Sequence, residues 1–549
     1  MVKAVHYFAD AWPKTFWQEF EVSRVDADLQ RIKEDGFNTV ILAVPWMGFE
    51  SNFEARKTRS DPRLYQRLEL LLQKIGEAGL NYILRVGFPH DFTPDMDTDN
   101  VQLCLGMYAE EHTLKQWADY LKKLRRVTNR HREALSGILL SWEDFWCVHF
   151  VFSYETEERR KWLARKLHYD DWLKTQDPGV VKILMGENAI QFEQIAVPIK
   201  DEPSYYLFMK FINEKLGGHI LQSTKAVFPE TAMEVRVDKD PVPSHKGTIW
   251  IENDLFLDET NHRGTYWAPY WGSRNEGEQL TLEQALANFE YFLRYASADG
   301  VATNHVIDQF NFFDNTPYFP NNAQIEDSSI PEFLEGVAPL IKQFSAGYGL
   351  WAYHDYVDNV LYNASFEFDL EGWAATGQVN VLHLAGENQL SMQRGSQISQ
   401  VIDSSDGFML SRTYVDLTLC FCSDSEGAAA ISESGVTLKE IDVTAGQNCH
   451  AFDASPIKEK KEALFGFQAL DDLVIDDLKL FGFVQRLGVY DEFGQPGKHL
   501  EGVRRLNGNL ELPAAPTRYT NQVFTQPPGG RCLPMAMVEE TTAQRGRIQ

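Results

Sequence analysis

The sequence has few cysteines, little positive charge and no long hydrophobic run, and each shortage excludes a class of protein. Its six cysteines among 549 residues show no disulfide-framework or zinc spacing, so we expect mostly buried thiols and one disulfide at most. Lys and Arg number 52 against 79 Asp and Glu, and the formal charge of −27 argues against nucleic-acid and anionic-membrane partners. No run of about 20 apolar residues occurs, so we expect no membrane span.

Several targeting and catalytic motifs are missing as well. The N-terminus lacks the apolar region of a signal peptide, which predicts a cytoplasmic protein unless it was trimmed from an exported precursor. The sequence contains no HxH or HExxH pair, no Gly-x-Ser-x-Gly elbow and no P-loop, so we expect no metal and no cofactor. It gives no indication of oligomeric state.

Hydrophobic residues make up 44% of the chain and charged residues 24%, as in a globular protein, and the length predicts two or three domains. Aromatic side chains are plentiful, with 13 Trp, 21 Tyr and 35 Phe. Large cores account for most of them, but aromatic rings are also the usual lining of sugar sites.

The first 350 residues alternate short apolar strands with amphipathic helices. Apolar runs at 39–46, 82–87 and 137–141 are separated by helical stripes, one of which is opened by Asp61 and Pro62 and closed by Gly79. This alternation predicts a parallel sheet, and the recurrence of strands favours a (β/α)8 barrel. An open doubly wound sheet is the competitor, but it would carry a glycine-rich phosphate turn after its first strand.

The second half of this region leaves the order of strands five to seven open. Stretches 232–237 and 247–252 both read as strands, yet the link between them is too short for a crossover helix. Thr281 and Gln284 form a capping box for the next helix. We expect the last barrel strand at 301–313 and a closing helix at 331–344.

The chain changes character near residue 358. Short alternating segments with turn residues replace the helices and predict a β-sandwich. We therefore divide the chain into a (β/α)8 domain, an all-β sandwich domain and an extended C-terminal segment that packs on the other domains or is partly disordered. Their expected ranges are 1–350, 358–484 and 485–549.

Two strand-like runs end in a glutamate. Gly-Ile-Leu-Leu-Ser-Trp leads into Glu143, and Gly-Thr-Ile-Trp-Ile leads into Glu252. Because chemistry in α/β barrels takes place where strands end, two such carboxylates suit hydrolysis of a glycosidic bond. The alternative is that each is an ordinary acid in a surface loop. Glu234 is a rival second carboxylate, but it lies in the middle of a strand.

These features resemble the clan A retaining glycoside hydrolases, which are (β/α)8 enzymes. In that clan the acid/base Glu closes strand four and the nucleophile Glu closes strand seven, and the resemblance assigns these roles to Glu143 and Glu252. The clan usually has Asn before the acid/base, where it binds the substrate 2-hydroxyl. Trp142 stands there instead, so either another side chain makes this contact or the site is altered.

The second domain is similar to carbohydrate-binding β-sandwich modules. Such modules open with an Asn-x-Ser-Phe-Glu phrase followed by Gly-Trp, as at 363–367 and 372–373. They close with an Asp-Asp-Val-x-Leu strand, to which Asp-Asp-Leu-Lys-Leu at 476–480 is similar. Many of these modules are structural only, so the similarity predicts a fold and leaves sugar binding open.

Around the two glutamates we expect residues that bind a sugar. Arg85 and Arg236 are candidate donors beside Glu252, although each could be a structural ion pair, and His90 either binds hydroxyls or caps a loop. The aromatic candidates for substrate binding are Trp46, Trp142, Trp146, Tyr266, Trp267 and Trp271.

Two hypotheses of different class follow. The first is a retaining glycosidase that cleaves a β-linked poly- or oligosaccharide by double displacement. The second is a catalytically silent carbohydrate-binding protein that uses barrel and sandwich as a recognition surface, and Trp142 favours it. A pure scaffold is a third alternative. The sequence does not give the sugar, its linkage, or endo or exo action.

Overall fold

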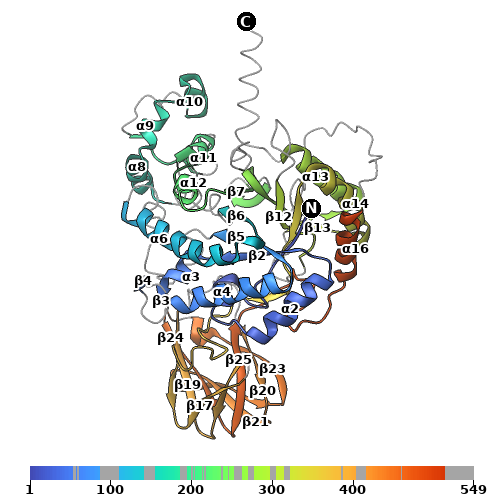
Figure 1. Cartoon of the computed structure of the whole chain (residues 1–549). Coiled ribbons are helices and arrows are strands. Elements are labelled where there is room, and N and C mark those ends of the chain that lie inside the picture. The colour runs from blue at the N-terminus through green and yellow to red at the C-terminus, as the bar shows by residue number, and fades with distance from the viewer. Residues whose placement is uncertain are drawn as a thin grey trace.

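Figure 1 shows the protein as a computed structural model. The structure describes residues 1–52, 57–58, 61–86, 111–140, 155–185, 194–199, 202, 204–212, 214–215, 218–236, 239–244, 247–252, 262–269, 277–296, 305–314, 322–384, 387–403, 416–458, 460 and 462–512.

Eight parallel strands close into a barrel in the order β1-β14-β12-β10-β7-β6-β5-β2. This arrangement confirms the predicted (β/α)8 fold. The strands in chain order are β1 (Val2–His6), β2 (Thr39–Val44), β5 (Asn81–Val86), β6 (Leu135–Leu140), β7 (Thr231–Arg236), β10 (His262–Trp267), β12 (Val306–Phe310) and β14 (Gly347–Leu350).

Helices cover the outside of the barrel (Figure 1). In α4 (Pro62–Glu77) the Asp61 side chain accepts a hydrogen bond from the Arg63 N–H at 2.9 Å, and its apolar stripe is buried against the sheet. The predicted capping box is present at the start of α13 (Leu282–Ala296). The Thr281 N–H donates to the Gln284 side-chain oxygen, and the Gln284 N–H donates to the Thr281 hydroxyl oxygen. The other helices around the barrel are α1 (Pro13–Phe16), α2 (Val22–Glu34), α3 (Trp46–Glu50), α6 (Glu111–Thr128), α13 (Leu282–Ala296) and α14 (Ile330–Phe344).

The order of the later strands differs from the prediction. The stretch 247–252 is not a barrel strand: it forms β9 (Gly247–Glu252), which pairs antiparallel with β8 (Lys239–Ser244) in a separate hairpin. The barrel strand after β7 is β10. The stretch expected as the last barrel strand contains β12, which is the seventh, and β14 follows the closing helix as the eighth.

Among the described residues, five α-helices lie between β6 and β7, on one side of the barrel (Figure 1). Tyr169, Trp172, Phe208 and Phe211 form their aromatic core, and the Tyr169 and Trp172 rings stack at 5.9 Å between centroids. These helices are α8 (Glu157–Lys166), α9 (Tyr169–Leu173), α10 (Pro178–Met185), α11 (Tyr205–Ile212) and α12 (Gly218–Lys225).

The second domain is a sandwich of two five-stranded antiparallel sheets, as predicted. One sheet has the order β16-β19-β24-β21-β22 and the other β17-β18-β25-β20-β23. Cys420 and Cys449 face each other across the second sheet and form a disulfide. The strands are β16 (Ala374–Thr376), β17 (Val379–His383), β18 (Asn388–Met392), β19 (Gln397–Asp403), β20 (Asp416–Ser423), β21 (Gly427–Glu433), β22 (Val436–Val443), β23 (Gly446–Asp453), β24 (Glu462–Ala469) and β25 (Leu473–Phe481).

After the sandwich the chain returns to the barrel. Strand β26 (Val484–Gln485) pairs with β15 (Tyr356–Val357), and α16 (Leu500–Glu511) packs against α14. The prediction of an extended segment from 485 onward is therefore wrong for α16. Asn507 fixes this helix, because its side chain accepts from the Tyr348 hydroxyl and donates to the Asp35 carbonyl. Residues 513–549 lie outside the described part.

Charged contacts join the sandwich to the barrel. Arg63 at the start of α4 forms an ion pair with Glu371 at 2.6 Å, and its guanidinium lies 3.8 Å from the Phe368 ring centroid. Lys479 of β25 forms an ion pair with Asp10, which follows β1, at 2.8 Å. The two domains thus meet through paired charges and cation–π contacts.

The junction between barrel and sandwich, where β25 meets the segment after β1, contains more acidic than basic side chains. Burial raises the pKa of Glu19 and of Glu21 to about 8 and that of Asp476 to about 9, and nearby acids add to each shift. Raised values mean that the folded state holds more protons than the unfolded state from about pH 4.5 upward, so the stability of the junction falls as pH rises to about 9. The groups that act on one another here are Asp10, Glu19, Glu21, Arg24, Asp476, Asp477 and Lys479.

We therefore predict that the variant Glu19→Gln/Glu21→Gln/Asp476→Asn flattens the alkaline loss of stability. Thermal melting of wild type and variant between about pH 6 and about pH 9 measures this, and the difference between the two should grow with pH. Glu158→Gln, on the exposed side of α8, is the control and should follow wild type. A constant difference between variant and wild type would contradict the prediction.

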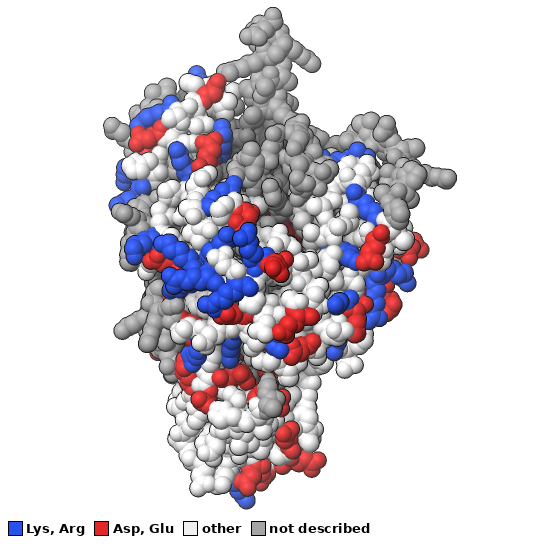
Figure 2. Space-filling view, in the orientation of Figure 1, with Lys and Arg blue, Asp and Glu red and all other residues white. Residues whose placement is uncertain are grey.

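Surface charges of both signs are interspersed on the face in Figure 2, with Lys and Arg gathered over α4 and α6. Three of these basic residues form ion pairs: Arg125 with Glu230, Arg130 with Glu69 and Lys122 with Asp119. Among the described helices, none has the length and apolar character needed to cross a membrane.

Candidate active site

The interior of the barrel begins with an apolar layer. Ala4, Ile41, Ile83, Leu139 and Ala232 come from five adjacent strands and pack together as a buried cluster. Side chains two residues apart on a strand point to the same side. The next positions toward the carboxyl ends of the strands therefore also face the interior, and they form the floor of the barrel mouth.

This second layer is charged. His6 of β1, Arg85 of β5 and Glu234 of β7 follow the apolar layer by two residues, and Asp308 of β12 joins them. The Arg85 guanidinium forms an ion pair with Glu234, donates to the Gln309 side-chain oxygen at 3.2 Å and has its Nε 3.7 Å from an Asp308 oxygen. All of these side chains are buried. We call Arg85, Glu234, Asp308 and Gln309 the lumen cluster.

Glycines make room for the lumen cluster. A Cβ on Gly264 of β10 would lie 2.7 Å from an oxygen of the Asp308 carboxylate. A Cβ on Gly349 of β14 would lie 2.5 Å from the Ile41 side chain and 2.7 Å from the Asp308 carbonyl. Both strands therefore need a residue without a side chain here.

We predict that Gly264→Ala disturbs the lumen cluster. The added methyl group must displace the Asp308 carboxylate, and overpacking of a filled interior costs about 1–3 kcal/mol. A lower melting temperature is the expected readout. Gly137→Ala is the matched control, because a Cβ at this glycine of β6 meets no atom within 4 Å. Equal melting temperatures for both variants would contradict the prediction.

His6 is neutral in this environment. Burial lowers the pKa of its imidazole well below the usual value, and the nearby Arg85 lowers it further. Its Nε2 lies 2.6 Å from the Asp308 carbonyl oxygen, so Nε2 carries the proton and donates to that oxygen. His6 thereby links β1 to β12, the two strands that flank β14.

An aromatic wall follows the carboxyl ends of β1 and β14. The Trp351 ring lies 4.7 Å from the His6 ring and 5.2 Å from the Phe8 ring, between centroids. Trp12 stacks on Tyr356 at 5.5 Å and meets Trp351 edge-on. Trp12 is half-buried, so its ring is partly open to solvent beside the mouth of the barrel.

Two predicted sugar-stacking residues are instead part of the core. Trp267 on β10 is fully buried among Phe289, Phe310 and Phe333 on the outer side of the sheet. Trp46 in α3 is 4% exposed and packs edge-on against Trp117. Neither ring can face a sugar, so these two predictions are wrong.

The remaining predicted residues fall into two groups. Arg85 lies in the interior, where it contacts the lumen cluster, and Tyr266 is buried on β10. Arg236 ends β7 and Glu252 ends β9, and the side chains of both are outside the description. Glu143, which comes three residues after the end of β6, also lies outside the described residues, as do His90, Trp142, Trp146 and Trp271.

Sequence reasoning missed several residues of the mouth. Asp308 and Gln309 interrupt the apolar run of β12, and a polar pair inside such a strand is the signal that could have identified them. Trp351 directly follows β14, and Trp12 lies in the segment after β1, so both come after the carboxyl end of a barrel strand. His6 is the last residue of β1, so it too has a strand-end position.

No family model matches the sequence, and no curated protein matches it. The solved structures that match include exo-β-1,4-mannosidase Op5Man5 from Opitutaceae bacterium strain TAV5, with 15% identity and a TM-score of 0.38. The match covers 65% of this chain and 52% of that one. GH5_18 from Streptomyces cattleya matches at 14% identity over 65% and 72% of the two chains, with a TM-score of 0.36. The endo-1,4-β-mannanase from Rhizomucor miehei matches at 9% identity over 64% and 86%, with a TM-score of 0.37.

Proposed function

We propose that the protein is a glycoside hydrolase that cleaves β-linked poly- or oligosaccharide with retention of configuration. The charged lumen cluster at the carboxyl end of the closed barrel carries this proposal, because active sites of such barrels lie at that end. In the sequence, Glu143 comes three residues after the end of β6, the fourth barrel strand.

In this proposal Glu143 protonates the leaving oxygen and later activates water. A second carboxylate attacks the anomeric carbon, and a retaining reaction needs it about 5–5.5 Å from Glu143. Glu252 is the candidate from the sequence. Glu234 and Asp308 are the candidates from the lumen cluster, where the Arg85 guanidinium favours an ionised carboxylate.

Substrate binding would involve the aromatic wall. Trp12 offers a partly open ring beside the mouth, and the apolar face of a pyranose packs well on such a ring. Trp142, Trp146 and Trp271 remain candidates for further subsites, with His90 and Arg236 as polar contacts. No step of this mechanism calls on a metal or a cofactor.

A catalytically silent carbohydrate-binding protein is the second candidate. Strand seven, β12, carries Asp308 and Gln309 where the clan resemblance implies a Glu, and Trp142 stands where it implies an Asn. Two departures at the two catalytic strands favour a barrel that still binds sugar but no longer cleaves it.

Nitrophenyl β-glycosides separate the two candidates. Wild type should release nitrophenol from at least one of the β-mannoside, β-glucoside and β-galactoside, and proton NMR should show the β-anomer as first product. Binding of oligosaccharide without cleavage of any glycoside would instead support the silent protein. An α-anomer as first product would contradict the retaining mechanism.

A further inference from the structure

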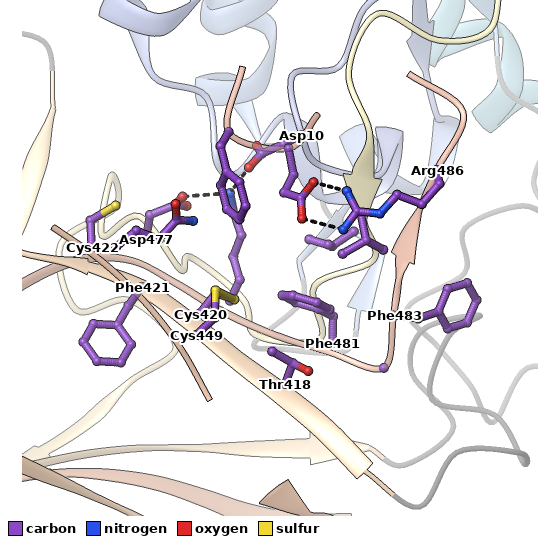
Figure 3. A pocket seen from close by; sticks show the side chains of 17 residues that line it. Asp10, Thr418, Cys420, Phe421, Cys422, Cys449, Asp477, Phe481, Phe483 and Arg486 are labelled. Atoms are coloured by element: carbon purple, nitrogen blue, oxygen red, sulfur yellow. Dashed lines mark hydrogen bonds and ion pairs between the residues drawn. A yellow bond between two sulfur atoms is a disulfide. The ribbon is translucent and has the colours of Figure 1, made fainter. Parts of the chain in front are cut away.

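A cavity lies between the barrel and the sandwich, apart from the lumen cluster. Its volume is about 370 Å³, within the ~300–1,000 Å³ typical of small-ligand sites, which are common at domain junctions. The barrel contributes Asp10 and Val357, from the segments that follow β1 and β14. The sandwich contributes strands β20, β23 and β25. We call this cavity the junction pocket (Figure 3).

The floor of the junction pocket is apolar. Val357, Phe481 and the Cys420–Cys449 disulfide form it, and the first two pack with Cys420 as a buried cluster. The Phe493 ring, 47% exposed, stands at the edge of the pocket. A ligand with one flat apolar face would bury that face here.

The charged side chains around the pocket are already paired. The Lys479 ammonium lies 2.8 Å from a carboxylate oxygen of Asp10 and 2.8 Å from one of Asp477. The Arg486 guanidinium is paired with Glu492, and its Nη2 donates to a Glu492 carboxylate oxygen at 2.9 Å. In Figure 3, Asp10 and Arg486 lie on one side of the pocket, and the disulfide and Thr418 lie on the other. Because each charge has a partner, a charged ligand would gain little, whereas a carboxylate oxygen that already accepts one hydrogen bond can accept another from a hydroxyl.

Neutral hydrogen-bonding groups complete the lining. Thr418 and Gln447 project from β20 and β23 beside the disulfide. An apolar floor with neutral and charge-paired polar groups around it fits a ring that has an apolar face and several hydroxyls. We infer that the junction pocket binds a neutral β-linked disaccharide unit, as a non-catalytic sugar site.

This inference deepens the proposed function. Asp10 and Val357 follow strands β1 and β14, whose carboxyl ends also carry His6 and the aromatic wall, so the pocket and the barrel mouth share one end of the barrel. A long glycan that reaches the mouth could place a further unit in the junction pocket. The pocket would then raise affinity for polymeric substrate and leave small aryl glycosides unaffected.

Cys422 allows binding to be followed directly. It lines the pocket as an exposed free thiol, and partial desolvation raises its pKa to about 11, which lowers its thiolate fraction and slows alkylation. We expect cellobiose, β-1,4-mannobiose or lactose at about 10 mM to slow the reaction of Cys422 with N-ethylmaleimide by at least about threefold. Peptide mass spectrometry reports Cys422 separately from the other cysteines.

Thr418→Phe should remove this protection, because the new ring fills the pocket without breaking an ion pair. Val436→Phe is the matched control: Val436 is 66% exposed on β22 of the other sheet, and protection should persist. Hydrolysis of aryl glycosides should be equal in both variants, while KM for a polymer rises only in Thr418→Phe. Absence of protection by all three disaccharides, or protection that survives Thr418→Phe, would overturn the inference.

The same experiment separates this inference from the proposed function. Protection of Cys422 in a protein that cleaves no glycoside would leave the junction pocket standing and reject the hydrolase. Cleavage of a glycoside without protection of Cys422 would support the hydrolase and reject the sugar site in the junction pocket.

Discussion

Glu143→Gln should lower kcat/KM for an unactivated β-linked oligosaccharide by about 10²–10⁴-fold, the usual contribution of a general acid. The amide cannot donate a proton to the leaving oxygen. The first step with a dinitrophenyl glycoside should suffer far less, because that leaving group departs without a proton. Steady-state rates on the two substrates, with burst kinetics for the second, measure the difference.

Glu133→Gln is the control for this prediction. Glu133 is an exposed acid just before β6, at the opposite end of the strand from Glu143, so its substitution should leave both rates unchanged. Melting temperatures of both variants should equal that of wild type if Glu143 acts on substrate only. Oligosaccharide hydrolysis within about threefold of wild type in Glu143→Gln would show that another group donates the proton.

Arg85→Met should cost about 3–5 kcal/mol of stability, the usual penalty for removing one partner of a buried ion pair. The Arg85 side chain has 0% exposure, and its loss leaves the Glu234 and Asp308 carboxylates buried without that cation. The penalty should shrink in acid, because a protonated carboxyl needs no cation. Thermal and urea unfolding across pH measure both effects.

Arg130→Met is the matched control, since its ion pair with Glu69 is 62% and 35% exposed and should contribute only about 0–1 kcal/mol. The double variant Arg85→Met/Glu234→Gln should recover part of the loss, because it removes one of the two buried charges. Equal stability of Arg85→Met and Arg130→Met would mean that the lumen cluster does not hold the barrel together.

The fold was predictable where local signals and burial agree. Strand β2 is apolar after Thr39 and buried throughout, and Asp61 with Pro62 marks the start of α4 in both sequence and structure. Strand β14 escaped prediction because its sequence is Gly-Tyr-Gly-Leu, with weak strand propensity. Only pairing with β1 and β12 makes it a strand, and those partners lie far away in sequence.

Strand β9 shows the opposite error. Its apolar residues suit a barrel strand, but its partner β8 lies just before it and leads to a hairpin. Helix α16 depends on Asp35 and Tyr348, which no local pattern connects to residue 507. A local hairpin decided the first case and long-range contacts decided the second, and propensity decided neither.

The candidate site was predictable only in part, because its residues come from strands that lie far apart in the sequence. Arg85 was identified from its strand-end position, but its partner Glu234 is 149 residues away, and the sequence offered Glu252 instead. Trp46 and Trp267 were misjudged because aromatic residues near strand ends can face either the mouth or the helices. Alternation along β10 turns Trp267 outward, and this depends on strand register, which the sequence alone did not give.

The central claim is that a carboxylate of the barrel acts as a nucleophile, and covalent trapping tests it most directly. The protein would be incubated with dinitrophenyl 2-deoxy-2-fluoro-β-glycosides of mannose, glucose and galactose, and its mass and peptides then measured. The account predicts one added sugar on Glu234 or Asp308, or on Glu252 of the β8–β9 hairpin, and no adduct when the protein is denatured before incubation. No adduct with any of the three, or an adduct on the sandwich, would contradict it.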